Sequence, residues 1–560
     1  SNWGMFNRHV LLLLDGRPVK DYSLGGFNLA AFSSGEFDRV ELLKGPHSSI
    51  YGSDALGGVL NLIPRSMLVD RLTLTSQVGT FGSQSYAING SRVLGSVGLG
   101  GYAEFSSADN HRPNSGVERT LAGLRVDHMS LDGHHSVSLS GRYFQDSLGV
   151  PSAMPDPNSI PMYGNELVGS IFNFQRDDNY SVDLRYRFFD ERMGEARLDL
   201  FWEKQNLDYN SLYYDGYVVA DVYSRALYNK RSSGICMRYQ KKTQSATIAG
   251  GVDWLSGSLG ATQTDSSVEA GGITETYTFW KGSQDQIDVW SNITYDISSY
   301  LTVDLSGRVH FVKDRKMQPS YNLGLIHRPT ETIRFKAGYA YAFRLPSMVD
   351  QFADEFYVTG NTNLNPETSR SWLITIEYGS TGSGSRVSLT FFRQRVDSLI
   401  QYDWSAWPAY PINIDKLRSV GLDLGFTMGL LDRGRLTGSF VYQDAEQTQG
   451  GGFVQANFVP EIKWRLDLSS DITNGISSSV TVAYTSDRSK LYGDMPKTIG
   501  KVYEFGASVA VKPTDYVRFV FSGEDLTDRA RPDQFGFSLS DRDFPGPGRR
   551  FHARVELDIM

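Results

Sequence analysis

Few side chains in this sequence stand at spacings that could perform bond chemistry. Serine, histidine and aspartate are plentiful, but none lies in the Gly-x-Ser-x-Gly context that exposes a nucleophilic serine at the top of a sheet. The glycines at 45, 52, 57 and 58 fit neither of the common phosphate-binding spacings. The single cysteine, Cys236, can form no internal disulfide and no multi-cysteine metal site. We therefore expect neither an enzyme nor a bound cofactor.

Two groups of polar side chains could hold a metal ion, and neither has a supporting pattern. His134-His135 stand together in a short turn, where they would form at most an adventitious site. Asp156, Asn158 and Asp177-Asp178 could collect calcium in a long loop, but the spacing of a calcium-binding loop is absent. We expect no metal site.

Composition argues against two further classes of protein. The chain has 560 residues, of which 40% are hydrophobic and 12% aromatic, and 56 are glycine. A helical membrane protein needs apolar runs of about 20 residues, whereas the longest run near the start covers only Val10 to Leu14. The formal net charge is −8 with acids and bases interspersed, while nucleic-acid binding needs a concentrated basic face. Helical membrane spans are excluded, and we expect no nucleic-acid partner.

The elements that must position any site are strands, because polar and apolar residues alternate with period two from about residue 70 onward. In Leu301 to Phe311 the apolar residues share one face, and Thr302, Asp304 and His310 lie on the other. The same pattern predicts 22 strands, near 71–79, 84–92, 97–105, 119–129, 136–146, 180–189, 196–206, 226–239, 245–254, 284–295, 300–312, 320–328, 332–342, 371–378, 385–402, 418–428, 435–444, 462–470, 476–485, 503–512, 516–523 and 550–559.

The connections between these segments alternate between short and long. Short links such as 190–195 and 431–434 are interleaved with long ones such as 147–179, 256–283 and 344–370. Short turns at one rim and long loops at the other are typical of transmembrane β-barrels, and about 22 strands is the size of plugged outer-membrane transporters. A lipid-embedded sheet can leave no edge unpaired, so the strands must close.

Residues 1–66 have a different pattern. Val10–Leu14 predicts a strand, Asp15–Pro18 a turn, and Arg39–Leu43 a second strand. The glycine-rich stretch that follows requires tight turns and close backbone approach. These features predict a compact α/β segment joined to a wide barrel.

Several motifs then resemble one known family. Asp38–Pro46 followed by Tyr51–Ile63 resembles the closing part of the plug domain of TonB-dependent outer-membrane receptors, and Leu14–Gly16 is similar to another plug motif. Phe343–Ser347 with Asn361–Ser369 resembles paired boxes of the receptor barrel. Weaker matches lie at Ser419–Asp423, Glu524–Asp528 and Pro547–Phe551. The Tyr51-Gly52-Ser53-Asp54 motif is most similar to the branch with cobalamin and catechol-siderophore receptors.

The resemblance implies an all-β transmembrane barrel of about 22 antiparallel strands at 67–560, with a small partial α+β plug domain at 1–66 inside its lumen. It implies a monomer in the lipid of the bacterial cell outer membrane, which binds a metal-chelate or cobalamin-like ligand. Such a receptor imports a scarce nutrient complex, of iron-siderophore or cobalamin type, with energy from the partner protein TonB. A haem ligand is disfavoured, because no histidine lies between Pro346 and Asn361.

Other possibilities stay open at this point. The chain is expected to lack the N-terminal part of the plug and the TonB-binding segment. A passive porin-like channel is one alternative, and an inactive truncated receptor fragment is another. A barrel enzyme or adhesin would need a catalytic triad at the rim or no energy coupling.

The resemblance also suggests residues for the site. Plug Arg and Glu residues pair with barrel carboxylates in the family. Arg39 and Glu41 match the plug positions, with Arg39 expected in a buried pair, and Glu367, Glu377 and Asp423 are candidate barrel partners. Ligand-binding candidates at the plug apex and in aromatic loops are Asp21, Tyr22, Ser23, Leu24, Tyr213, Tyr214, Tyr217, Phe352, Phe356, Tyr357, Trp404, Trp407 and Tyr410.

Overall fold

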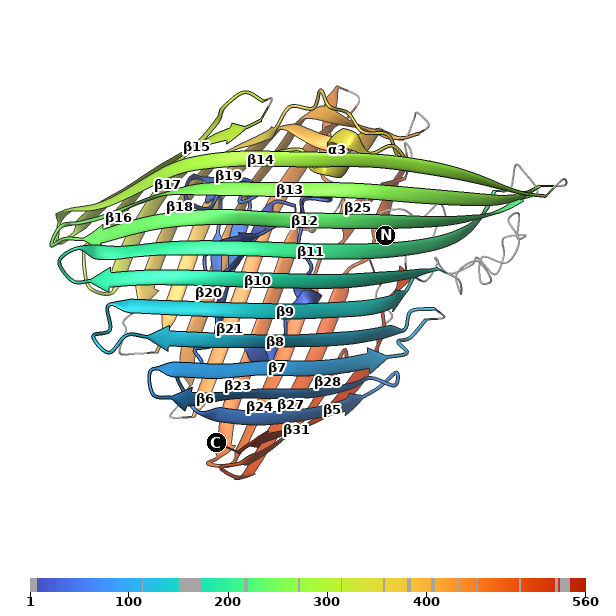
Figure 1. Cartoon of the computed structure of the whole chain (residues 1–560). Coiled ribbons are helices and arrows are strands. Elements are labelled where there is room, and N and C mark those ends of the chain that lie inside the picture. Colours follow the sequence, from blue (N-terminus) through green and yellow to red (C-terminus); the bar gives the residue numbers. More distant parts are fainter. Residues whose placement is uncertain are drawn as a thin grey trace.

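Tilted strands form a closed barrel around a smaller domain in the computed structural model of the chain (Figure 1). The structure describes residues 8–112, 114–150, 173–215, 220–269, 272–313, 315–355, 358–379, 384–403, 408–430, 433–449, 451–492, 495–528, 532–533 and 544–559. No helix in these ranges is both long and apolar enough to cross a membrane.

Twenty-two strands of the described part of the chain close into the barrel, and the last one pairs antiparallel with the first, His552 lying opposite Gly79. They are β5 (Arg71–Gly79), β6 (Gln84–Leu94), β7 (Val97–Ala108), β8 (Val117–Met129), β9 (His135–Gly149), β10 (Phe174–Asp190), β11 (Gly194–Asp215), β12 (Ala220–Lys242), β13 (Ala246–Glu269), β14 (Gly272–Ser298), β15 (Leu301–Val312), β16 (Gln318–His327), β17 (Ile333–Arg344), β18 (Glu367–Gly379), β19 (Arg386–Asp403), β20 (Tyr410–Leu430), β21 (Gly434–Gln449), β23 (Ile462–Thr473), β24 (Ile476–Thr485), β27 (Val502–Thr514), β28 (Val517–Glu524) and β31 (Arg550–Asp558).

Five short strands lie outside this ring. They are β22 (Gly452–Gln455), which pairs with β21, and the two-stranded sheets β25 (Arg488–Tyr492) with β26 (Met495–Ile499) and β29 (Pro532–Asp533) with β30 (Phe544–Pro545).

The barrel predicted from alternation is confirmed, and each predicted segment overlaps one barrel strand. The lengths differ most at β11 to β14, where the predicted loops 207–225 and 256–283 are largely strand. Beyond the apolar belt, polar residues such as Lys204, Lys281 and Asp285 interrupt the outward apolar positions, so alternation no longer marks a continuous strand, yet the ladders between neighbouring strands continue. Figure 1 shows β12 to β14 reaching far toward one rim, which we call the long-loop rim.

Side chains alternate between the membrane and the lumen along each strand. In β10, Val182, Leu184 and Tyr186 are exposed on the outer face. Asp183 and Arg185, at the intervening positions, point into the lumen, where the plug lies. The polar half of each strand is therefore available to hold another domain.

The inner domain is a four-stranded sheet in the order β2-β1-β4-β3. Its strands are β1 (Val10–Leu14), β2 (Arg17–Val19), β3 (Phe37–Lys44) and β4 (Gly58–Pro64). The central strand β1 pairs parallel with β4 and antiparallel with β2. Its leucines are buried on both faces, as expected of a central strand covered on two sides. The predicted first and second strands are present, and β4 comes from the glycine-rich stretch.

Candidate functional site: the interface between plug and barrel

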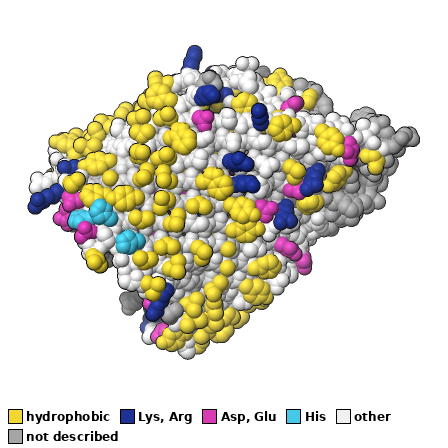
Figure 2. Space-filling view, in the orientation of Figure 1, with side chains coloured by type: hydrophobic (Ala, Val, Ile, Leu, Met, Phe, Trp, Pro, Cys, Tyr) yellow, Lys and Arg dark blue, Asp and Glu magenta, His cyan; other side chains and the backbone are white. Residues whose placement is uncertain are grey.

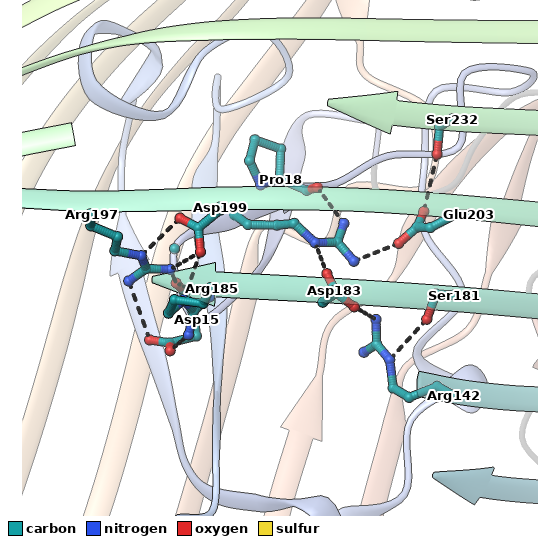
Figure 3. A network of polar contacts seen from close by, with 12 residues as sticks. Asp15, Pro18, Arg142, Ser181, Asp183, Arg185, Arg197, Asp199, Glu203 and Ser232 are labelled. Atoms are coloured by element: carbon teal, nitrogen blue, oxygen red, sulfur yellow. Dashed lines mark hydrogen bonds and ion pairs between the residues drawn. The ribbon is translucent and has the colours of Figure 1, made fainter. Parts of the chain in front are cut away.

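The hairpin of β1 and β2 is fixed to the barrel by a buried arginine. Arg17 is 1% exposed and donates to Asp183 of β10 and, at 2.7 Å, to Glu203 of β11. Burial alone would lower the pKa of Arg17, but these two carboxylates raise it above its usual value. Figure 3 shows that Asp183 also accepts from Arg142 of β9, at 3.1 Å. One buried network thus joins the plug to three strands.

The tip of the same hairpin, Asp15 and Gly16, lies among three arginines of the wall. Figure 3 shows two of them, Arg185 and Arg197, beside Asp15. Arg185 and Arg197 donate to the carbonyl oxygen of Asp15, and Arg238 donates to that of Gly16 at 2.6 Å. Both tip residues have positive φ, 48° and 82°. A Cβ at position 16 would also lie 2.7 Å from the Arg238 guanidinium. Backbone conformation and space therefore both require glycine there.

The short helix α1 (Ser48–Tyr51) holds the plug against β15. The hydroxyl oxygens of Ser49 and Ser306 are 2.7 Å apart, and both side chains are buried. Arg308, two residues along the strand and 3% exposed, donates to the carbonyl oxygen of Ile50 and pairs with Asp288 of β14 at 2.9 Å. The plug must break these polar contacts before α1 can leave the wall.

The connection between β17 and β18, residues 345–366, lies over the plug, and we call it the cover loop. It contains helix α3 (Met348–Phe352). The first two backbone N–H groups of this helix donate to the carbonyl oxygens of Tyr22, at 2.9 Å, and Ser23, at 3.0 Å. The cover loop is thus hydrogen-bonded through its backbone to the plug apex.

Five ionisable residues tie the plug, the cover loop and the barrel together, and we call them the anchor cluster. Arg344 makes a bidentate pair with Glu367, at 2.8 and 2.7 Å, and both side chains are 1% exposed. Nε2 of His9 in the plug lies 2.8 Å from Glu367, and Arg8 lies 3.3 Å from Asp350. Burial alone would raise the pKa of Asp350, but Arg8 and Arg344 lower it below its usual range.

A second carboxyl group of the cover loop, that of Glu355, is buried near no cation among the described residues. It accepts hydrogen bonds from the Tyr228 hydroxyl at 2.8 Å and from Nε1 of Trp280 at 3.2 Å. Burial raises the pKa of Glu355 to about 7, since the two hydrogen bonds only partly offset it, and Asp265 and Asp354 add to the rise.

We expect docking of the cover loop to weaken as the pH rises toward 7. The pKa of Glu355 is about 7 in the docked loop against 4.5 in water, so docking takes up a proton between these values. The Glu355 contribution to docking is then greatest below pH 4.5, falls as the pH rises to 7 and is constant above it, whereas the Asp350 pairs weaken docking only as the pH falls toward 3.8 and below. Glu355→Gln should remove this dependence on pH. The control Asp354→Asn, at the neighbouring exposed residue, should leave the dependence unchanged. Hydrogen exchange of the loop at about pH 5 and pH 8, expressed as protection relative to the intrinsic amide rate at each pH, measures the effect, and equal wild-type protection at both contradicts it.

Of the three barrel carboxylates expected to contact the plug, two do so in the structure and the third does not. Glu367 contacts the plug through His9, and Asp423 does so through Lys44 of β3, at 2.6 Å. Glu377 instead pairs with Lys336 within the barrel wall.

The buried pair expected of Arg39 is not formed in the described part of the chain. Its side chain is 58% exposed and bonds to Glu41, at 2.9 Å, on the same face of β3. The physical reason is the alternation of the strand, which places residues two apart side by side and satisfies the arginine locally. The buried arginine of the plug is Arg17.

The ligand-binding candidates at the plug apex lie beneath the cover loop. Asp21 pairs with Lys230 of β12 at 2.9 Å. Tyr22 is 8% exposed and packs with Leu24 and Phe352 in one apolar cluster. Tyr410 begins β20 and is half-buried. Tyr213 and Tyr214 lie in β11, with side chains outside the described part, and Tyr217, Phe356, Tyr357, Trp404 and Trp407 lie outside the described residues.

Sequence reasoning missed most of the buried charges that hold the plug. Arg17 stands in the predicted turn, and Arg344 stands in a quoted barrel motif. Asp183, Arg185 and Arg308 occupy lumen-facing positions of predicted strands. Alternation could have assigned these residues to the lumen, but it carries no information on which plug residue each would meet.

A closed transmembrane barrel with a separate sheet domain in its lumen, joined by buried ion pairs and covered by a loop, defines a plugged membrane channel. Comparison with protein families agrees with this class. The description "TonB dependent receptor-like, beta-barrel" matches residues 109–523, and "TonB-dependent Receptor Plug Domain" matches residues 1–59. The chain belongs to the TonB-dependent receptor family of the bacterial outer membrane.

Among curated relatives, the chain is similar to proteins named vitamin B12 transporter BtuB. The one from Photobacterium profundum is 24% identical over 461 residues, which cover 76% of this chain and 66% of the relative. The one from Vibrio vulnificus strain YJ016 is 22% identical over 567 residues, which cover 99% of this chain and 84% of the relative.

Solved structures share the fold at lower identity. The siderophore receptor PiuA from Acinetobacter baumannii matches with a TM-score of 0.80 and 14% identity, covering 100% of this chain and 90% of that one. The copper transporter OprC matches with a TM-score of 0.82 and 13% identity, covering 99% of this chain and 92% of that one.

Proposed function

We propose that this receptor captures a cobalamin-type complex outside the cell and imports it when TonB rearranges the plug. The observation that carries the proposal is the nature of the plug–barrel interface. It consists of ion pairs and hydrogen bonds such as those of Arg17, Ser49 and Glu367, which can break and re-form in water. An interface meant to stay closed would favour apolar packing.

The cover loop gives the proposal a route from ligand to plug. Its helix α3 is hydrogen-bonded to Tyr22 and Ser23 at the apex, and its Asp350 pairs with Arg8. A ligand that displaces the loop from outside would break these bonds and loosen the apex. The buried position of Tyr22 means that the loop must move before the apex can touch a ligand.

The ligand class rests on the relatives that align over most of the chain. Those named vitamin B12 transporters reach 24% identity, whereas siderophore and copper receptors that share the fold are 12–16% identical. Cobalamin is therefore the first choice, and a ferric siderophore is the second.

We expect saturable cobalamin uptake that depends on TonB. The full-length natural protein is produced in cells that lack their own cobalamin receptor, and uptake of labelled cyanocobalamin and of a labelled ferric catecholate is compared at limiting concentration. Cobalamin uptake that stops in cells without TonB supports the proposal. Uptake of the ferric catecholate alone contradicts the ligand class. Uptake that is unsaturable and independent of TonB contradicts active transport and indicates a passive channel.

A further inference from the structure

On the outer face of β11 to β14, cationic residues follow the apolar ones just above the apolar belt. Trp202, Trp254 and Ile287 face the membrane there, 43%, 40% and 47% exposed, and mark the edge of the belt toward the long-loop rim. Lys204 stands two positions beyond Trp202 and faces the same way, because side chains alternate along a strand. Arg231 of β12 lies directly opposite it. Figure 2 shows Lys and Arg side chains beside the band of hydrophobic side chains on this face.

These outward cations lack counter-charges among the residues that the structure describes. Lys204 and Arg231 form a cross-strand pair of like charge, which is destabilising unless an anion lies nearby. Lys281 of β14 and Lys313, just after β15, are also exposed. None of the four has an ion-pair partner in the part of the chain that the structure describes. The pair of like charges breaks a local rule of sheet stability, and no carboxylate of the described residues forms an ion pair that would offset it.

The cations border a groove at the place where β14 extends beyond the end of β15. The strand β15 ends at Val312, whereas β14 continues to Gly272 without a paired strand on that side. The groove in this notch has a volume of about 860 Å³. The charged residues of its lining are Arg231, Lys281, Lys313, Arg315 and Asp285.

Two of these charged groups are held in place by neighbours. Arg315 donates to the carbonyl oxygen of Leu364, at 3.1 Å, and to the side chain of Gln351, so the cover loop fixes its guanidinium. The Asp285 carboxylate accepts from Ser256 on β13 at 2.6 Å. The lining therefore carries four cations against one carboxylate, and that carboxylate is already engaged.

We propose that this groove, with Lys204 beside it, binds the phosphorylated headgroup of a glycolipid in the outer leaflet. The cations lie beyond the apolar edge of the belt, Lys204 two positions after Trp202 and Lys281 six positions before Ile287, which is the side on which headgroups begin. Several phosphates on one headgroup suit cations spread over β11, β12 and β14 better than a single small anion does. Ile287, exposed on the outer face of β14 at the edge of the belt, offers apolar surface for the acyl chains.

Retention of lipid by the purified receptor tests the proposal. The natural protein in detergent is incubated with diphosphorylated lipid A, excess lipid is removed, and the bound lipid is counted by native mass spectrometry. The charge-removing pairs Lys204→Gln with Arg231→Gln, and Lys281→Gln with Lys313→Gln, should each lower retention, by about fivefold for each charge removed. Unchanged heat-modifiable mobility in gels shows that these surface variants remain folded.

The matched control is Lys241→Gln, which removes an exposed cation from the same outer face of β12 at the opposite rim. Retention at the wild-type level in this control, with loss in both paired variants, supports the site. Equal loss in the control overturns it, because the effect would then be one of overall charge. Displacement of lipid A by millimolar inorganic phosphate also overturns the lipid assignment and indicates a site for a free anion. Retention unchanged in all variants overturns the proposal.

Discussion

Cross-linking the plug to the barrel at Ser49 and Ser306 is expected to abolish uptake until the cross-link is reduced. The hydroxyl oxygens of these residues are 2.7 Å apart, and both side chains are buried between α1 and β15. Cysteines at the two positions would therefore have Cβ atoms close to the separation that a disulfide needs. If import requires α1 to leave the wall, a covalent bond at this point holds the plug closed.

The experiment uses Ser49→Cys with Ser306→Cys in a Cys236→Ser background, which removes the single native thiol. Uptake is measured before and after a membrane-permeable reductant, and cross-linking is followed by the shift of a protease fragment. The single change Ser306→Cys serves as the control and should transport normally in both states. Uptake by the fully cross-linked receptor at the control rate would show that the plug moves without separating from β15.

Arg344→Met is expected to release the cover loop from the plug. The arginine is 1% exposed and makes a bidentate pair with Glu367, and its loss leaves that carboxylate and the one on Asp350 buried without their shared partner. Breaking such a pair costs about 3–5 kcal/mol, far more than loss of an exposed pair. Limited proteolysis and hydrogen exchange of residues 345–355 should therefore rise strongly.

The matched control for this prediction is Lys44→Met. It removes the plug–barrel pair with Asp423, which has a similar length, 2.6 Å, but a lysine that is 63% exposed. Exposed pairs contribute about 0–1 kcal/mol, so little change is expected. The double change Arg344→Met with Glu367→Met should restore part of the protection, because no buried charge is left alone. Equal effects of Arg344→Met and Lys44→Met would show that burial does not decide the strength of these contacts.

The barrel could be predicted from the sequence because its signal is local and repeated. A lipid-facing strand such as β15 must carry apolar residues at every second position, and lipid tolerates no exception that would leave a charge outside. The upper parts of β11 to β14 could not be predicted in the same way. They stand in water on their outer face, where Lys281 and Ser283 replace apolar residues and the alternation disappears.

The plug–barrel site could be predicted only in part, because its contacts join residues far apart in the chain. Arg17 and Asp183 are 166 positions apart, and no periodicity relates them. The motif resemblance pointed to Arg39, whose neighbour Glu41 satisfies it within the same strand. Glu367 and Asp423 meet the plug, but through His9, which no motif marks, and through Lys44, which lies in the quoted plug motif without any sign of its partner.

The contacts of the hairpin tip limit which residues can replace Asp15 and Gly16 during evolution. Three wall arginines reach the carbonyl oxygens of the tip, so what they recognise is mainly the shape of the backbone. Residue 15 could drift to asparagine, which also tolerates positive φ, at the cost of its ion pairs with Arg185 and Arg197. Residue 16 has less freedom, because its φ of 82° favours glycine and a Cβ there would displace the Arg238 guanidinium. Variation at this turn is thus limited by geometry at both positions and by charge at residue 15.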